Sequence, residues 1–112
     1  MIDSYSFGQI IIKGKRYEKD LLILGEMIHP NWWRKSGHHL TLEDIGEVLL
    51  FSPEVLIVGT GALGRMIISP EVKEFCLEEK IDLQVLTTGE AIKVFNILIN
   101  QKKIAGLFHL TC

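Results

Sequence analysis

The sequence predicts one α/β domain, residues 1–112, with three layers around a mixed β-sheet. Two observations carry this prediction. The second half alternates short apolar runs with segments of helical periodicity in the order β-α-β-α-β, and its connections are short enough for right-handed parallel crossovers. The first half has β-branched runs separated by glycine turns. We therefore expect a C-terminal β-α-β-α-β unit joined to N-terminal antiparallel β structure.

The first third of the chain is predicted to form strands and one irregular segment. Residues 7–13 are a β-branched run that ends at a turn around Gly14, and residues 20–25 have an apolar centre. The segment that follows extends the sheet only as an edge strand or a loop, because Pro30 has no N–H to donate. Residues 31–40 are polar, so we expect an irregular surface segment there.

The periodicity changes to that of a helix at Thr41. Thr41 and Asp44 resemble a capping box, and the apolar residues that follow keep helical spacing to about Phe51. Pro53 lies just beyond, where a helix is expected to have ended. Residues 55–58 are apolar at every position, which favours a central strand that is covered on both faces.

Two further helices and two strands complete the prediction. The segment Ser69-Pro70-Glu71 starts a helix with a hydroxyl cap, a proline in the first turn and an acid at the positive end of the dipole. Residues 83–87 are a strand, Thr87 and Glu90 form a capping box for the next helix, and residues 104–111 are a strand. The residues expected to face the core on these helices are Val72, Phe75, Cys76, Ala91, Ile92, Phe95, Leu98 and Ile99.

The composition excludes several classes of partner. Apolar residues make up 47% and charged residues 23% of the chain, and the net charge is −2. This charge gives no global attraction to nucleic acid or acidic lipid, and no run approaches the roughly 18 apolar residues that cross a bilayer. The chain starts without a secretory signal, and its two cysteines form no disulfide framework. We therefore expect a cytoplasmic protein without membrane insertion.

The turn after residues 55–58 has the spacing G-x-G-x-x-G, with Gly59, Gly61 and Gly64. A dinucleotide site also needs a helix that starts at this turn and an acid at the end of the next strand. Here Pro70 limits any helix at the turn to about one turn, and the next strand ends in two threonines. We predict no dinucleotide cofactor and interpret the turn as a site of close backbone packing.

Two other features remain candidates for binding. Because ligands of open α/β sheets bind beyond the carboxyl ends of strands, the N–H groups of Thr60 and Gly61 could hold a small anion. Residues 32–39 place two tryptophans beside two cations and two histidines, a set suited to an anion, a base or a protein contact. The alternative is that one indole plugs the sheet while the charges are solvated. Binding of single-stranded nucleic acid needs a longer basic groove, so we do not predict it.

No catalytic or metal centre is recognisable. The spacing of His29, His109, Cys76 and Cys112 matches no metal-ligand pattern, and the two adjacent histidines in residues 32–39 cannot easily share one metal. Cys76 is expected to be a small core hydrophobe. His109 is expected to be a hydrogen-bonded core histidine. We therefore assign no catalytic residue, no metal ligand and no cofactor.

An ordered set of short motifs spans essentially the whole chain. The motifs are Phe7-Gly8-x-Ile10-x-Ile12-x-Gly14, Tyr17-x-x-Asp20, Trp33-Arg34, His38-His39, Gly59-Thr60-Gly61, Pro70-Glu71, Thr88-x-x-Ala91, Phe95-Asn96-x-Leu98 and Leu107-Phe108-His109-Leu110-Thr111-Cys112. The set resembles a family of small conserved α/β domains of unknown function that includes the mammalian adipogenesis-associated domain protein and a mitochondrial assembly factor for respiratory complex I. The resemblance implies a three-layer fold with a mixed sheet and, for the mitochondrial member, assembly of a membrane complex through protein contacts. Phe95 stands where many relatives have tyrosine, and from residues 1–112 we expect no targeting segment of the kind that a mitochondrial member carries.

The favoured hypothesis is a non-enzymatic domain, monomeric or weakly dimeric, that binds a partner protein through an exposed Trp33-Arg34 loop and the adjacent end of the central sheet. The alternative is a small-molecule or anion site, possibly enzymatic, at the glycine turn and the same loop. The candidate binding residues are Trp33, Arg34, His38, Gly59, Thr60, Gly61 and Thr88.

Overall fold

A five-stranded mixed sheet, in the order β5-β4-β10-β7-β9, is the middle layer of the computed structural model, which describes residues 1–112. Its strands are β4 (Leu21–Leu24), β5 (Met27–His29), β7 (Val55–Gly59), β9 (Asp82–Leu86) and β10 (Ile104–Phe108). Strands β10, β7 and β9 are parallel, whereas β4 and β5 are paired antiparallel at the other side of β10. The predicted C-terminal parallel unit and the antiparallel N-terminal strands thus share one sheet.

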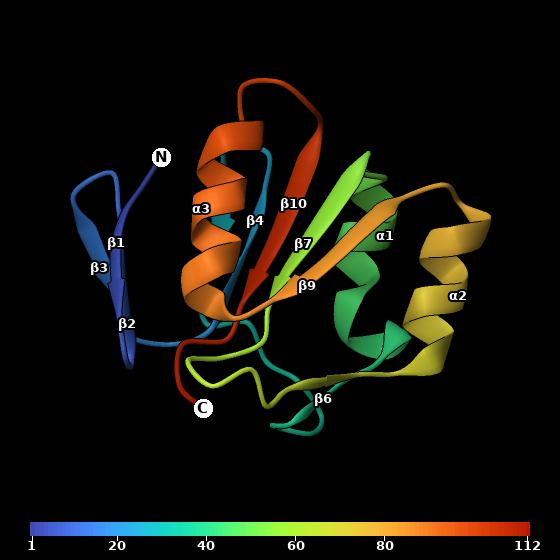
Figure 1. The fold of residues 1–112 in the computed structure, drawn as a ribbon, viewed down its shortest axis with the longest axis horizontal. Coiled ribbons are helices and arrows are strands. Elements are labelled where there is room, and N and C mark those ends of the chain that lie inside the picture. Colours follow the sequence, from blue (N-terminus) through green and yellow to red (C-terminus); the bar gives the residue numbers. More distant parts are fainter.

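Each face of this sheet is covered by its own layer (Figure 1). On one face lie α3 (Thr88–Leu98) and a separate antiparallel sheet of β1 (Ile2–Ser6), β2 (Gln9–Ile12) and β3 (Lys15–Tyr17). On the other face lie α1 (Gly46–Phe51), preceded by the 3-10 turn η1 (Leu42–Ile45), and α2 (Pro70–Glu78). This arrangement confirms the predicted three-layer α/β fold. None of the helices combines the length and apolar composition needed to cross a bilayer.

The core is divided into two clusters by the alternation of side chains along the strands. Val55 and Ile57 of β7 pack into the cluster on the α3 side. Leu56 and Val58 pack into the cluster on the side of α1 and α2. Because successive side chains of a strand point to opposite faces, a strand covered on both faces is apolar at every position. All five residues of β7 are buried, as the sequence predicted.

The glycine turn is not followed directly by a helix. After Gly64 the chain forms the short strand β8 (Ile67–Ile68), which pairs with β6 (His39–Leu40), and only then does α2 begin at Pro70. Ser69 occupies the N-cap position, as predicted, but the predicted hydroxyl cap does not form, because the Ser69 hydroxyl makes no capping hydrogen bond and lies 3.5 Å from the Glu71 carboxylate. The predicted break before Pro70 is therefore confirmed.

Some predicted boundaries differ from the structure. The strand predicted over residues 7–13 is the shorter strand β2, which pairs antiparallel with β1 in a hairpin. It starts only at Gln9 because Gly8, with a φ of 82°, belongs to the turn between the two strands. Strand β10 ends at Phe108 and not at Thr111. Beyond its end, the Leu110 N–H donates to the Asp20 carboxylate and not to a neighbouring strand.

The two predicted capping boxes behave differently. At η1 the Asp44 carboxylate accepts from the Thr41 backbone N–H at 3.0 Å, so the predicted contact forms. At α3 the side chain of Thr87 makes no capping hydrogen bond, and Glu90 pairs with Lys93 at 3.3 Å instead of reaching back to the cap. The capping box predicted at Thr87 is therefore wrong, although the helix begins where it was expected.

The glycine turn packs against the last residues of the chain. Gly61 has a φ of 109°, and a Cβ atom added there would lie 2.8 Å from the carbonyl oxygens of Thr111 and Cys112. The neighbouring Ala62 N–H donates to the Thr111 carbonyl at 2.8 Å. Gly61 is therefore required both by its backbone conformation and by the close approach of the C-terminal backbone.

We predict that Gly61→Ala destabilises the protein by about 2 kcal/mol or more, because a left-handed conformation alone costs a side-chain-bearing residue about 1–3 kcal/mol and the new methyl group also collides with two carbonyls. Urea denaturation measures the free energy of unfolding. Gly89→Ala is the matched control, since a Cβ added there meets no atom within 4 Å. Equal stability of the two variants would contradict this reading of the turn.

Candidate functional site

A buried ionic cluster joins the ends of β4 and β10. Asp20 precedes β4 and His109 follows β10, and the antiparallel register that pairs Leu21 with Phe108 places them side by side. One carboxylate oxygen of Asp20, Oδ2, lies 2.6 Å from Nη1 of Arg34 and 2.6 Å from Nδ1 of His109. The other oxygen accepts from the Leu110 N–H at 2.8 Å. One carboxylate thus holds three segments of the chain together.

The contacts of His109 favour a proton on its Nδ1 atom. Nδ1 lies 2.6 Å from the Asp20 carboxylate, which only accepts, and 3.2 Å from Nη2 of Arg34, which only donates. The shorter contact is satisfied when Nδ1–H donates to Asp20. Nε2 of His109 is buried without a partner, as is Nε of Arg34. His109 is therefore a hydrogen-bonded core histidine, as its position in the sequence predicted.

The hydrogen bonds at Asp20 outweigh its burial. Burial alone would raise the pKa of this carboxyl, but the hydrogen bonds from His109, the Leu110 N–H and Arg34 lower it below its ordinary value of 3.8. Asp20 is thus a carboxylate that is charged in the folded protein and paired with a buried guanidinium.

Arg34 is buried, contrary to the expectation of an exposed or solvated cation. Its residue exposure is 9%, and Nη2 donates to the Gly37 carbonyl at 2.9 Å while Nη1 contacts Asp20. The guanidinium also lies 4.8 Å from the ring of Trp32, in cation–π geometry. The buried Arg34 therefore holds the loop in place through its bonds to Asp20 and Gly37. The residue that the loop exposes to solvent is Trp33.

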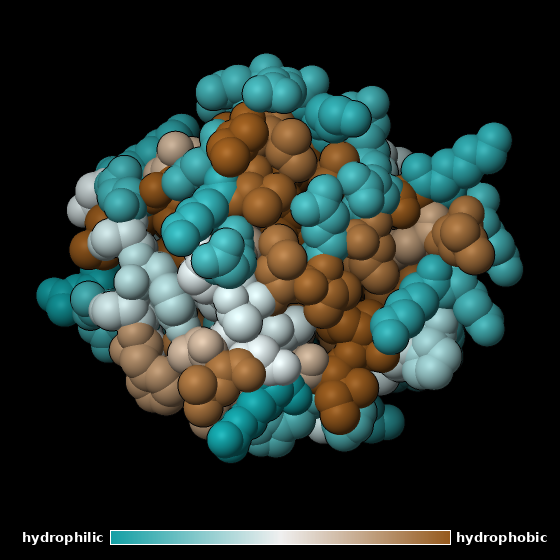
Figure 2. Space-filling model, in the orientation of Figure 1, coloured by the Kyte–Doolittle hydropathy of each residue, from teal (hydrophilic) through white to brown (hydrophobic).

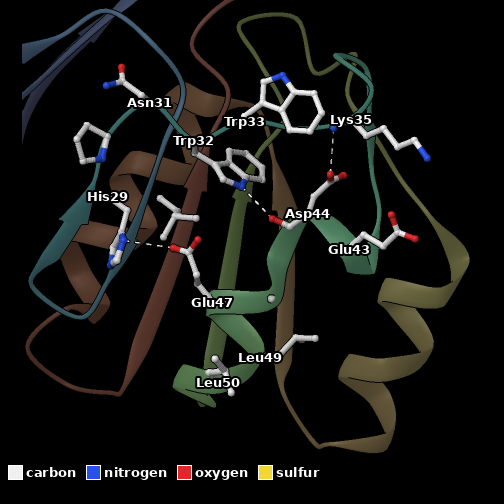
Figure 3. Close-up of a pocket in the computed structure, with 13 residues that line it drawn as sticks. His29, Asn31, Trp32, Trp33, Lys35, Glu43, Asp44, Glu47, Leu49 and Leu50 are labelled. Atoms are coloured by element: carbon white, nitrogen blue, oxygen red, sulfur yellow. Dashed lines mark hydrogen bonds and ion pairs between the residues drawn. The ribbon is translucent and has the colours of Figure 1, made fainter.

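Trp33 lies beside an open groove (Figure 3). Its side chain is 75% exposed, whereas the preceding Trp32 packs against the core and donates from Nε1 to the Asp44 carbonyl at 2.9 Å. The groove has a volume of about 990 Å³ and runs between β5, residues 30–35 and α1. The indole of Trp32 thus packs against the sheet, as the alternative interpretation expected, and the indole of Trp33 remains exposed for binding.

The groove combines apolar and charged side chains. Leu50 is 89% exposed at its α1 side, and Leu22 and Leu49 are among the other apolar residues that line it. His29 of β5 and Glu47 of α1 approach to 3.2 Å and tie the two walls together (Figure 3).

The residues of the glycine turn meet elsewhere, at the carboxyl ends of β7 and β9. The Thr88 hydroxyl accepts from the Gly61 N–H at 2.9 Å and donates to the His109 carbonyl at 2.5 Å. The Thr60 N–H donates to the Leu86 carbonyl at 2.8 Å. Both backbone donors proposed for an anion are thus engaged within the chain, so an anion would have to displace these bonds.

The candidate residues therefore form two groups, connected through His109. Gly59 lies against Thr88, since an added Cβ would lie 3.0 Å from the Thr88 hydroxyl. His38 is exposed, and its carbonyl accepts from the Ile67 N–H at 2.8 Å. Sequence reasoning missed Asp20 as a site residue, and the only local signal was an acid directly before a buried apolar run. It also missed the α1 wall of the groove.

No group of three or more histidine, cysteine or acidic side chains converges as metal ligands would. Cys76 is buried, and this burial raises the pKa of its thiol, which disfavours the reactive thiolate. Cys76 therefore packs as a small apolar side chain, as expected.

The match to a family model spans residues 2–109, nearly the whole chain. The chain belongs to the family of proteins of unknown function DUF498/DUF598. Among curated proteins it is similar to the NADH dehydrogenase (ubiquinone) 1 alpha subcomplex assembly factor 3 of Xenopus tropicalis, with 26% identity over 107 residues. The match covers 94% of this chain but only 57% of that protein, so the chain spans little more than half of its length. The family resemblance expected from the sequence is confirmed.

Solved structures of the same fold include a conserved hypothetical protein of Pyrococcus horikoshii, with 29% identity and a TM-score of 0.86 over 100% of this chain and 99% of that chain. A structure described as an outer membrane protein of Bartonella henselae has 26% identity and a TM-score of 0.83, and the match covers 99% of this chain and 94% of that chain. The three-layer arrangement is therefore common to this DUF498/DUF598 protein and its relatives.

We predict that the stability of this DUF498/DUF598 protein falls at acidic pH through Asp20. A carboxyl whose pKa is lower in the folded than in the unfolded chain stabilises the fold above the unfolded value, and this stabilisation is lost as the pH falls through the folded value. The loss is therefore expected below about pH 4. Asp20→Asn should remove most of this dependence and destabilise the protein by about 3–5 kcal/mol at pH 7, because Arg34 is left without its counter-ion.

Urea denaturation between pH 2 and pH 7 measures both effects, with Asp82→Asn as the control because Asp82 is an exposed residue at the start of β9. An Asp20→Asn variant as stable as the control variant at pH 7 would contradict the role of the cluster.

Proposed function

We propose that this protein is a non-enzymatic protein-binding domain that recognises its partner through Trp33 and the adjacent groove. One observation carries the proposal: a tryptophan that is 75% exposed stands beside an open groove of about 990 Å³. Large, isolated aromatic side chains next to a concavity are the usual anchors of protein interfaces.

The backbone on both sides of Trp33 is fixed, which supports a role in binding. The Trp32 N–H donates to the Asp20 carbonyl at 2.8 Å, and the Lys35 N–H donates to the Asp44 carboxylate at 3.1 Å. Because neighbouring residues are already ordered, little conformational entropy is lost when the indole binds. Arg34 acts in this proposal as a positioning residue that holds the loop against Asp20.

The lining of the groove matches the composition of a binding surface. Its apolar members include Trp33 and Leu50, which lie toward opposite ends of the groove in Figure 3, and the charged side chain of Glu47 lies between them. A mixture of apolar and polar side chains is typical of non-obligate protein interfaces. We infer that a partner inserts one or two large apolar side chains between the indole and α1.

The similarity to an assembly factor favours a partner protein over a small ligand. The name of the Xenopus relative describes a protein that assists assembly of a subcomplex, a task that depends on protein contacts. The donors of the glycine turn, in contrast, already have partners within the chain. We propose a cytoplasmic location for this contact, as expected from the sequence, and cell fractionation tests it.

We predict that Trp33→Ala reduces capture of the partner at least tenfold, because removal of an interface anchor costs about 2 kcal/mol or more. A photo-crosslinking phenylalanine analogue at position 33, introduced in the native cell, identifies the partner by mass spectrometry. The purified partner then gives the change in Kd. The same analogue at Phe7 is the matched control, because this aromatic is 63% exposed on the β1–β2 turn.

Circular dichroism verifies that Trp33→Ala keeps the fold. The proposal is wrong if both positions crosslink the same proteins, or if the folded variant binds the crosslinked partner as tightly as the original chain.

A further inference from the structure

The two edges of the central sheet differ in protection. Strand β5 has three residues, is followed by Pro30 and faces the groove described above. Strand β9 has five residues, contains no proline and pairs only with β7. Natural proteins protect sheet edges with prolines, charges, bulges or short strands, because an open edge pairs readily with another strand. β9 is therefore the edge that is able to accept a further strand.

The hydrogen bonds of β9 show which backbone groups face outward. The Asp82 N–H donates to the Glu54 carbonyl at 3.0 Å, and the Leu86 carbonyl accepts from the Thr60 N–H at 2.8 Å. In a strand, alternate residues direct their N–H and C=O groups to opposite sides. Leu83 and Val85 consequently direct their donors and acceptors away from β7, where the chain offers no partner strand.

An apolar band accompanies this edge. Figure 2 shows brown atoms that run from α3 across β9 toward the segment that precedes α2. Exposed apolar residues on these elements are Ile97 of α3 at 63%, Val85 of β9 at 42% and Ile67 of β8 at 56%. An incoming strand would therefore find exposed apolar side chains beside its backbone hydrogen bonds.

The charge beside the edge indicates the chemistry of the partner. Residues 69–86, which form α2 and β9, carry five carboxylates and two lysines, a formal charge of −3. No ion pair within the chain neutralises these carboxylates. Antiparallel pairing of β9 with a second copy would bring the two α2 helices together and oppose like charges. The edge therefore favours a basic segment over a second copy.

We propose that β9 is a docking edge for an extended segment of another protein in which basic and apolar residues alternate, and which adds to the sheet as a sixth strand. The backbone groups of Leu83 and Val85 provide the affinity, the apolar band receives one set of side chains, and the acidic α2 selects for lysine or arginine. This surface is separate from Trp33 and does not depend on the function proposed above.

Synthetic peptides test this proposal. The probe is an acetylated, amidated peptide of alternating valine with lysine and arginine, and its controls are a glutamate analogue and an N-methylated analogue that cannot donate from its backbone. In nuclear magnetic resonance titrations, the basic peptide should shift the amide signals of Leu83 and Val85 and slow their hydrogen exchange at least tenfold. At low salt both control peptides should bind at least tenfold more weakly.

A matched pair of variants locates the site on the protein. Val85→Lys, a change at a partly exposed position, should weaken binding of the basic peptide at least tenfold by repulsion and by loss of apolar contact, whereas Trp33→Ala should leave it unchanged. The proposal is overturned if millimolar basic peptide leaves both amides unshifted, or if the N-methylated peptide binds equally well. It is also overturned if sedimentation shows a dimer that Val85→Lys dissociates, because the edge would then be occupied by a second copy.

Discussion

The carboxylate of Asp20 connects parts of the chain that lie far apart in the sequence. It is paired with Arg34 and His109 at 2.6 Å and accepts from the Leu110 N–H. On one side these contacts fix the loop that exposes Trp33, and on the other they fix the residues that cover the glycine turn. A buried charge pair is expensive to break, since removal of one partner leaves the other desolvated without compensation. The cluster therefore sets the geometry of both regions at once.

The glycine turn shows how a ligand-binding geometry serves internal packing. In open α/β sheets, ligands bind where adjacent strands lead to helices on opposite faces. Strand β7 leads to α2 on one face and β9 leads to α3 on the other, so this crevice lies at the turn. Here the carbonyl of Thr111 accepts from Ala62, and Gly61 allows its close approach. The glycine at the centre of the G-x-G-x-x-G spacing thus allows the turn after β7 to pack directly against the C-terminal backbone.

Local signals predicted much of the fold, and contacts between distant residues escaped prediction. Pro70 marks the start of α2, and the uniform apolarity of β7 reveals that both of its faces are covered, because these properties depend on neighbouring residues alone. Strand β1 was not predicted, because its sequence is largely polar and it is ordered by pairing with β2. Arg34 was expected to be exposed because its counter-ion Asp20 lies 14 residues earlier in the chain, and only the folded structure brings the two together. The groove likewise needs α1 and β5 to meet, which no local pattern indicates.

The two surfaces proposed for binding lie at opposite edges of one sheet. The groove opens between the edge strand β5 and α1, whereas the unprotected strand β9 closes the other end of the strand order. Between them stand three fully or largely buried strands, so a partner at one edge leaves the backbone and side chains of the other edge free. With both proposed surfaces occupied, the sheet would hold two chains at a fixed separation. That geometry would suit the protein-binding role proposed above.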